Sequence, residues 1–333
     1  MIIYHKESEI HRGNKPNQRF PNTPLCISVL CNETHNMKQA MNEDVKPNSL
    51  QAWILAARPK TLTAASIPVM IGCALAEAHG HFQATPAILC FLFAFLMQID
   101  ANFINDLYDF LKGSDREDRL GPERACAQGW ITPQNMKKGI LLTTALAALC
   151  GLCLLYYSGW EMIPVGIACL VFAYLYTTLA YHGWGDILVL VFFGFVPVGC
   201  TYYVMAHTWN GSVTIASLAC GLVIDTLLMV NNFRDREQDA ISGKRTLVVR
   251  FGAKTGLIVY FLLGLTACWL CFYFVGQGKL WASILPELYL LIHILTTVRM
   301  ARIGKGKALN AILGETSRNM FFFGILLSAG LLL

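Results

Sequence analysis

Long apolar runs constrain this chain more than any other feature, and they follow one another from Trp53 to the C-terminus. A helix needs roughly 20 apolar residues to cross a hydrocarbon layer about 30 Å thick. Nine runs approach or exceed that length, at about 50–78, 84–110, 135–157, 160–181, 186–207, 213–233, 254–275, 279–300 and 318–333. A transmembrane barrel would show short alternating segments instead, and backbone groups in lipid must be satisfied locally. We therefore predict an all-α integral membrane protein with nine transmembrane helices.

Composition agrees with a membrane location and argues against nucleic acid as a partner. Only 14% of the 333 residues are charged, whereas a soluble domain has about a quarter. The 26 Lys and Arg against 21 Asp and Glu leave a net charge of +5, which is too mild to indicate a nucleic-acid surface. We expect the partners to be small substrates and membrane lipid.

Residues 1–48 differ from the rest of the chain. They are polar, contain four prolines and show no apolar period, and no charged n-region with an apolar core marks a signal peptide. We expect a disordered extension at 1–48 and a nine-helix membrane domain at 49–333.

Basic residues gather in alternate connections between the predicted helices. The connections after the second, sixth and eighth helices carry almost all of them, and those after the first, third, fifth and seventh carry only Lys279. Because basic loops stay in the cytoplasm, we expect the N-terminus and these three loops on the cytoplasmic side of the cell membrane.

Two of these basic regions contain matched acidic clusters. Asn102, Asp106 and Asp109 are spaced i, i+4, i+7 near the end of the second predicted helix, so they share one helical face. The spacing i, i+4, i+8 places a second set on one face near the end of the sixth helix: Asn231, Asp235 and Asp239. Both clusters begin Asn-x-x-x-Asp.

Carboxylates that share a face at a helix C-terminus repel one another and oppose the helix dipole. A site of oxygen ligands without His or Cys suits Mg²⁺, which proteins bind through carboxylates and substrate phosphates. Lys and Arg around the clusters would then bind those phosphates. The pattern predicts a diphosphate held by bridging Mg²⁺ in a cavity that faces the cytoplasm, with Asp106, Asp109, Asp235 and Asp239 as catalytic metal ligands.

These residues also carry a family resemblance, which covers about residues 50–333. The segment Asn105-Asp106-x-x-Asp109 resembles the first Asp-rich motif of UbiA-type intramembrane prenyltransferases, although Gly113 replaces the last acid and Asp115 follows. Further stretches resemble the 1,4-dihydroxy-2-naphthoate polyprenyltransferases within that family. They are Lys112-Gly113-x-Asp115, Gly121-Pro122-x-Arg124, Asn231-Asn232-x-Arg234-Asp235, Gly243-Lys244-x-Thr246-Leu247 and Ala57-Arg58-Pro59-Lys60-Thr61.

The resemblance implies an enzyme that transfers a polyprenyl group from its diphosphate to 1,4-dihydroxy-2-naphthoate, giving demethylmenaquinone with loss of CO₂ and diphosphate. It implies Mg²⁺ as cofactor. It also implies substrate contacts by Arg58 and Lys60 (diphosphate or acceptor carboxylate), by Lys112, Arg124 and Lys244 (leaving diphosphate), and by the remaining motif residues Asn102, Asn105, Asp115, Asn231 and Asn232.

Two alternatives stay open from the sequence. The same fold could prenylate another aromatic acceptor, such as 4-hydroxybenzoate. An ion-coupled secondary transporter would also carry intramembrane acids, although such acids usually lie near the midplane at broken helices.

Overall fold

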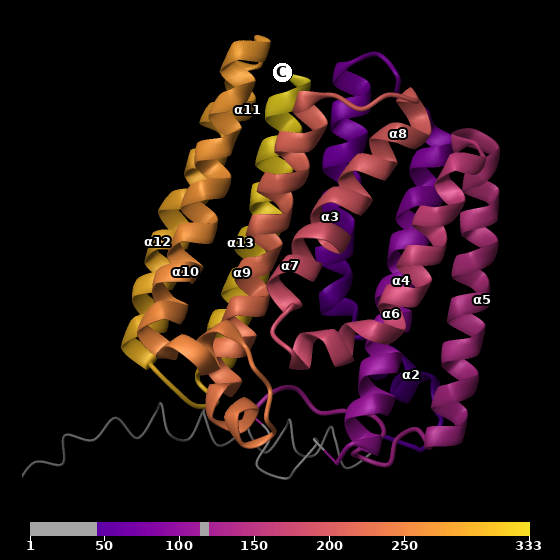
Figure 1. Cartoon of the computed structure of the whole chain (residues 1–333), viewed down its shortest axis with the longest axis vertical. Helices are drawn as coiled ribbons and strands as arrows, with labels where there is room; N and C mark the ends of the chain where they lie inside the picture. Colours follow the sequence, from indigo (N-terminus) through magenta and orange to yellow (C-terminus); the bar gives the residue numbers. More distant parts are fainter. Residues whose placement is uncertain (1–44, 114–119) are drawn as a thin grey trace, which may run out of the picture. The chain divides into compact units, whose positions relative to one another are not determined.

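Helices make up the regular structure of the described part of the chain, residues 45–113 and 120–333, in which no strand occurs. In this computed structural model, the unit Lys46–Leu333 contains roughly parallel helices joined alternately at their two ends (Figure 1). Most of the predicted extension at 1–48 lies outside the described residues. The elements are α2 (Leu50–Ala57), α3 (Pro59–Ala78), α4 (Ala84–Leu111), α5 (Pro133–Ser158), η1 (Trp160–Met162), α6 (Ile163–Tyr181), α7 (Gly185–Val189), η2 (Leu190–Gly199), α8 (Cys200–Ala206), α9 (Gly211–Ile241), α10 (Leu247–Cys271), η3 (Phe272–Gln277), α11 (Leu280–Ile284), α12 (Pro286–Ile303) and α13 (Leu309–Leu332).

The first predicted helix, 50–78, is wrong as a single element. It is divided at Arg58, whose φ of 52° and ψ of 69° lie in the left-handed region. Pro59 explains the break, because the ring of a proline disfavours the α conformation of the residue before it. Arg58 therefore lies at a bend between α2 and α3, and Lys60 lies in the first turn of α3 rather than deep inside a helix.

Eight helical segments of the described residues are long and apolar enough to cross a membrane. They correspond to the first eight predicted runs, with α6 preceded by η1 and with α7, η2 and α8 forming one continuous segment. The ninth predicted run lies within α13, whose first half carries Glu315, Arg318 and Asn319. A ninth span thus stays a prediction.

The two helices that carry the acidic clusters are longer than a membrane span requires. α4 has 28 residues and α9 has 31. At 1.5 Å per residue they reach about 42 and 46 Å, well beyond a hydrocarbon layer about 30 Å thick. α9 continues to Ile241 instead of ending near 233, so Asp235 and Asp239 both lie within the helix. This extra length lets charged residues stand on helices beyond the apolar layer.

Helix α9 lies at the centre of the bundle and has the largest buried share of the eight candidate spans. It packs closely against η2, a π-helical stretch, where Gly194 and Gly221 meet. A Cβ on Gly194 would lie 2.6 Å from the carbonyl oxygen of Ser217. Small residues permit this close backbone approach, as in other membrane helix pairs.

Apolar side chains cover the outer faces of the bundle. On α5 the exposed residues include Leu141, Leu142, Leu149 and Leu152, and on α12 they include Leu291 and Leu295. A protein in water does not expose this much apolar surface. The fold is therefore that of an integral membrane protein.

Candidate active site

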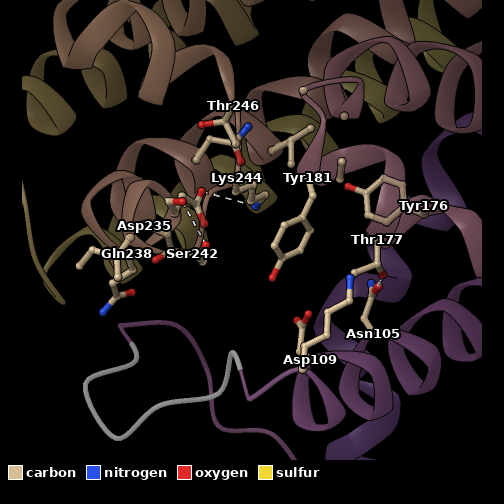
Figure 2. A pocket seen from close by; sticks show the side chains of 18 of the residues that line it. Asn105, Asp109, Tyr176, Thr177, Tyr181, Asp235, Gln238, Ser242, Lys244 and Thr246 are labelled. Carbon is tan, nitrogen blue, oxygen red and sulfur yellow. Dashed lines mark hydrogen bonds and ion pairs between the residues drawn. The ribbon is translucent and has the colours of Figure 1, made fainter.

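The connections after α4, α6, α9 and α12 lie at the same end of the bundle (Figure 1). Among these connections a cavity of about 680 Å³ opens. Three of the four predicted metal-binding carboxylates line it, namely those of Asp109, Asp235 and Asp239. Figure 2 shows Tyr181 projecting between Asp109 of α4 and the side chains of Asp235 and Lys244. The cavity thus brings together the two acidic clusters, as the sequence predicts.

On the α4 side, each charged side chain of the cavity has a partner. Asp109 accepts a hydrogen bond from Nη2 of Arg124, a residue of the following loop. The Nζ of Lys112 lies 4.5 Å from the ring centre of Tyr181, at the end of α6. Asn105, one turn before Asp109, accepts a hydrogen bond from the hydroxyl of Thr177 on α6. These contacts fix α4 against the end of α6.

On the α9 side, each carboxylate also faces a basic residue. The guanidinium of Arg234 donates to both oxygens of Asp235, from Nε at 2.7 Å and from Nη2 at 2.6 Å. The Nζ of Lys244 lies 3.4 Å from Oδ2 of Asp239. Asn232 also lines the cavity and is buried.

Asp106 does not line this cavity, in contrast to the expectation for a metal ligand beside Asp109. Its side chain is 1% exposed and accepts the backbone N–H groups of Ala125 and Cys126, each at 2.9 Å. The Nη2 of Arg58 lies 4.0 Å from its Oδ2. Asp106 therefore anchors the loop 120–131 onto α4. The loop folds back over α4 because the carboxylate satisfies two N–H groups that would otherwise be buried without partners.

A second cavity, of about 540 Å³, adjoins the first one. Its lining is mostly apolar and comes from α3, α4, α5, α6, η2 and α9. The two cavities share the lining residues Asn105, Tyr176 and Leu228. The space is thus polar at one end and apolar at the other, as an amphiphilic ligand requires.

Two predicted site residues line the apolar cavity instead of the polar one. Asn102 donates to the carbonyl of Ala57 and to the hydroxyl of Thr61, both at 2.9 Å, and so ties α4 to the bend between α2 and α3. Asn231 donates to the carbonyl of Leu227 in its own helix.

The remaining predicted site residues are less closely connected with the cavities. Arg58 lines neither of them. For Lys60 only the backbone is described, and Asp115 lies outside the described residues.

Several cavity residues were not predicted from the sequence. They come from the end of α6, from α7, from the end of α9 and from the α9–α10 connection: Thr177, Tyr181, Asp186, Gln238, Ser242 and Thr246. The polar residues after Asp239 belong to a loop whose path depends on Arg245, whose backbone N–H donates to the carbonyl of Tyr181.

The donor set fits a hard divalent cation. The polar side chains of the described residues that line the cavity carry carboxylate, amide and hydroxyl groups, together with the cations of Lys and Arg, and such oxygens are the ligands of Mg²⁺. Within the described residues, no three His, Cys, Asp or Glu side chains gather closely enough to hold a metal alone. A metal here needs further oxygens from a bound phosphate or water, which is the usual arrangement for Mg²⁺.

Comparisons with known proteins show the family to which this chain is similar. The UbiA prenyltransferase family matches residues 65–325. The 1,4-dihydroxy-2-naphthoate octaprenyltransferase of Escherichia coli K12 is 37% identical over 243 residues, which cover 69% of this chain and 79% of that protein. The protein of the same name from Haemophilus influenzae is 34% identical over 311 residues, 89% of this chain and 99% of its own.

The fold is also similar to that of a solved structure. A UbiA homolog from Archaeoglobus fulgidus, solved with DMAPP and Mg²⁺ bound, superposes with a TM-score of 0.60 over 83% of this chain and 99% of its own. Only 15% of the residues are identical, so this likeness concerns the fold.

Proposed function

The chain belongs to the UbiA prenyltransferase family, and we propose that it prenylates 1,4-dihydroxy-2-naphthoate. In the reaction the allylic carbon–oxygen bond to diphosphate breaks and a carbon–carbon bond to the aromatic ring forms. The carboxyl group leaves as CO₂, and the product is demethylmenaquinone in its reduced, quinol form. The names of the Escherichia coli and Haemophilus influenzae relatives support this acceptor.

The observation that carries the proposal is the continuity of a charged cavity with an apolar one. A polyprenyl diphosphate is a charged head on a hydrocarbon chain. The Asp109, Asp235 and Asp239 cavity suits the head, and the adjoining apolar cavity suits the chain. Tyr176 lines both, so it lies where the reacting carbon and the acceptor ring would meet.

We assign the metal to Asp109, Asp235 and Asp239, the carboxylates of the two acidic clusters that line the cavity. Mg²⁺ bound there would neutralise charge on the leaving diphosphate. Asp106 serves the site indirectly, by holding the loop that carries Arg124. The structure of the Archaeoglobus fulgidus homolog with Mg²⁺ supports a divalent metal in this family.

Three basic residues of the cavity are suited to bind the diphosphate. Lys112, Arg124 and Lys244 all line it, from α4, the 120–131 loop and the α9–α10 connection. Their positive charges would stabilise the leaving group as the allylic bond breaks. The apolar walls beside Tyr176 exclude water, which would otherwise convert the allylic cation to an alcohol.

The basic connections at the cavity end support a cytoplasmic orientation of the site, in the cell membrane. The acceptor and the metal would then enter from the cytoplasm. The prenyl chain would enter from the lipid side, where the apolar cavity lies among the helices.

The test is turnover by purified protein in lipid nanodiscs with MgCl₂, a series of polyprenyl diphosphates and a panel of aromatic acids. We expect prenylation of 1,4-dihydroxy-2-naphthoate with release of one CO₂ per product. Turnover of 4-hydroxybenzoate should be at least roughly a hundredfold lower, since a site built for one hydrogen-bonded ligand rejects others strongly. A preference for 4-hydroxybenzoate would overturn the acceptor assignment, and no transfer to any acid would overturn the enzymatic proposal.

A further inference from the structure

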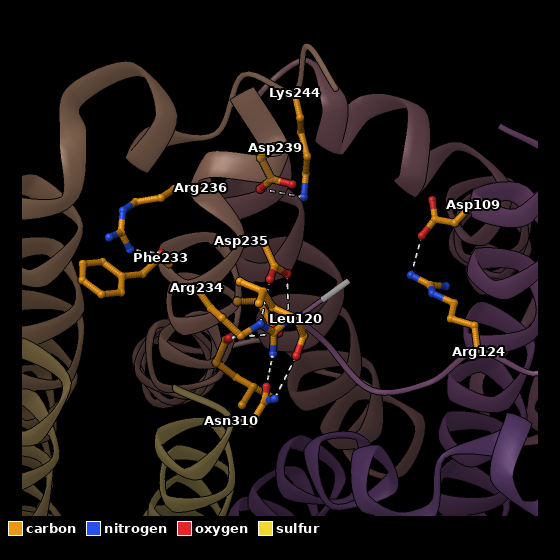
Figure 3. A network of polar contacts seen from close by, with 12 residues as sticks. Asp109, Leu120, Arg124, Phe233, Arg234, Asp235, Arg236, Asp239, Lys244 and Asn310 are labelled. Atoms are coloured by element: carbon orange, nitrogen blue, oxygen red, sulfur yellow. Dashed lines mark hydrogen bonds and ion pairs between the residues drawn. The ribbon is translucent and has the colours of Figure 1, made fainter. Parts of the chain in front are cut away.

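A continuous chain of hydrogen bonds runs from Asp235 to the loop 120–131 through a residue of the last helix (Figure 3). Arg234 holds Asp235 with two of its nitrogens, and its third nitrogen, Nη1, donates to Oδ1 of Asn310 at 2.8 Å. The Nδ2 of Asn310 then donates to the carbonyl oxygen of Leu120 at 2.8 Å. The second acidic cluster is thus connected to the start of the loop.

The loop 120–131 also contacts the first acidic cluster, on α4. The backbone N–H groups of Ala125 and Cys126 bind Asp106. Arg124 of the same loop binds Asp109 (Figure 3). The loop 120–131 therefore contacts α4 through Asp106 and Asp109, and Asn310 links it to Arg234 beside the α9 cluster.

We propose that Asn310 is a positioning residue that sets the spacing between the two acidic clusters, by tying Arg234 of α9 to the loop 120–131. The proposal rests on the proposed function, because a diphosphate that bridges the clusters needs both of them at a fixed separation. Asn310 lines neither cavity, so it acts through Arg234 and Leu120 and not by touching substrate.

An asparagine suits this position because its amide both accepts and donates. Its oxygen receives the guanidinium of Arg234, and its nitrogen serves a backbone carbonyl. An aspartate could do only the first, and a leucine could do neither. The amide is at an exposed edge of the protein, where water competes for the same bonds, so the effect of losing it is moderate.

Loss of the tie should leave both ends less ordered. Arg234 would keep Asp235 but lose the partner of its third nitrogen, and the loop would lose its attachment at Leu120. Ligand binding would then have to order Arg234 and the loop, and the free-energy cost of that ordering weakens affinity. The structure of the bound state would change little. We therefore expect KM for prenyl diphosphate to rise and kcat to change little.

Cys126 offers a readout that does not depend on activity. It forms no disulfide and is 4% exposed, in the loop that Asp106 and Asn310 hold. Maleimide labelling of the full chain, resolved by peptide mass spectrometry, measures how often this loop opens. Cys271, free and 0% exposed on α10, reports in the same sample whether the bundle itself opens.

The matched control is Asn319→Leu. Asn319 lies on the same helix, is buried and donates to the hydroxyl of Thr296 at 2.9 Å, so its loss also removes one tie of α13. We expect Asn310→Leu and Asn310→Asp to raise the labelling rate of Cys126 roughly twofold to tenfold, the range expected for one neutral hydrogen bond. Asn319→Leu should leave that rate unchanged, even if it lowers the unfolding temperature.

A binding measurement completes the test. MgCl₂ with inorganic diphosphate should raise the unfolding temperature of the wild type and of Asn319→Leu. Asn310→Leu should need a several-fold higher diphosphate concentration for the same rise. Equal Cys126 labelling in Asn310→Leu and wild type would overturn the proposal, as would equal changes in Asn310→Leu and Asn319→Leu. Because labelling needs no turnover, a failure of the acceptor assignment leaves this result interpretable.

Discussion

Arg124 donates from its Nη2 to Oδ2 of Asp109, so a residue of the loop 120–131 closes against the first acidic cluster. The same relation recurs on α9, where Arg234 pairs with Asp235, and at the start of the next connection, where Lys244 pairs with Asp239. Each of these three carboxylates thus has a basic partner from the chain itself. A magnesium diphosphate carries both kinds of charge. We therefore expect the carboxylates to turn to the metal and the basic residues to the phosphates when it binds.

The first prediction concerns the cavity carboxylates. Asp109→Asn and Asp235→Asn should each lower kcat/KM at least a hundredfold, because an amide keeps the size but loses the charge that holds Mg²⁺. Excess chelator should reproduce the loss in wild type, and added MgCl₂ should reverse it only there. MgCl₂ with diphosphate should no longer raise the unfolding temperature of either variant.

The control for this prediction is Glu315→Gln, which removes the carboxylate of an exposed pair with Arg299 at 2.9 Å on α13 and α12. Its turnover should match wild type. Turnover that survives the chelator would count against a metal at this site.

The second prediction separates Asp106 from Asp109. In Asp106→Asn, one of the two N–H groups of Ala125 and Cys126 would face an amide nitrogen that cannot accept a hydrogen bond. We expect faster labelling of Cys126 and a lower unfolding temperature. Asp109→Asn should leave the labelling rate closer to wild type, because the two backbone bonds of Asp106 remain. If Asp106→Asn abolished Mg²⁺ binding with the loop still closed, the carboxylate would be a metal ligand after all.

The sequence predicted more of the helices than of the contacts between them. Apolar run lengths located eight of the candidate spans, because a hydrocarbon layer sets the length of each helix. Pro59 indicates a break at Arg58, but the apolar run continues across it and led to the prediction of one helix. The shared helical face of Asp235 and Asp239 followed from their spacing, although the apolar run ended near 233 and the helix continues to Ile241.

The role of Asp106 could not be predicted in this way. Its spacing from Asp109 is the same whether its carboxylate faces a metal or two backbone N–H groups of a loop nineteen and twenty residues later. Asn310 carries no pattern that joins it to Arg234, 76 residues before it. Such contacts depend on the path of each loop back to the bundle, which no local sequence pattern predicts.

The third prediction concerns Lys112 and Tyr181. The Nζ of Lys112 lies over the tyrosine ring, a contact worth about 0.5–2 kcal/mol that also orients the ammonium toward the cavity. Lys112→Met should raise KM for prenyl diphosphate roughly tenfold, since a cation that contacts the phosphates is lost. Tyr181→Phe keeps the ring face and should behave like wild type, whereas Tyr181→Leu should show part of the Lys112→Met effect. Equal kinetics for Tyr181→Phe and Tyr181→Leu would mean that the ring does not orient Lys112.

The last prediction concerns Asp100, an acid inside α4 that lines neither cavity and that the sequence analysis passed over. It is 0% exposed and accepts hydrogen bonds from the hydroxyls of Thr143 and Thr144 on α5, the second at 2.9 Å. A buried carboxylate deprived of its donors is costly, so Thr143→Val with Thr144→Val should lower the free energy of unfolding by roughly 2–4 kcal/mol. Asp100→Asn in that background should recover part of the loss, because a neutral amide tolerates the apolar surroundings better than a charge. Thermal unfolding in detergent measures both.

The control is Thr255→Val on α10, whose hydroxyl donates only to the carbonyl of Phe251 in its own helix. If the double valine variant were no less stable than Thr255→Val, the α4–α5 contact would not depend on this acid.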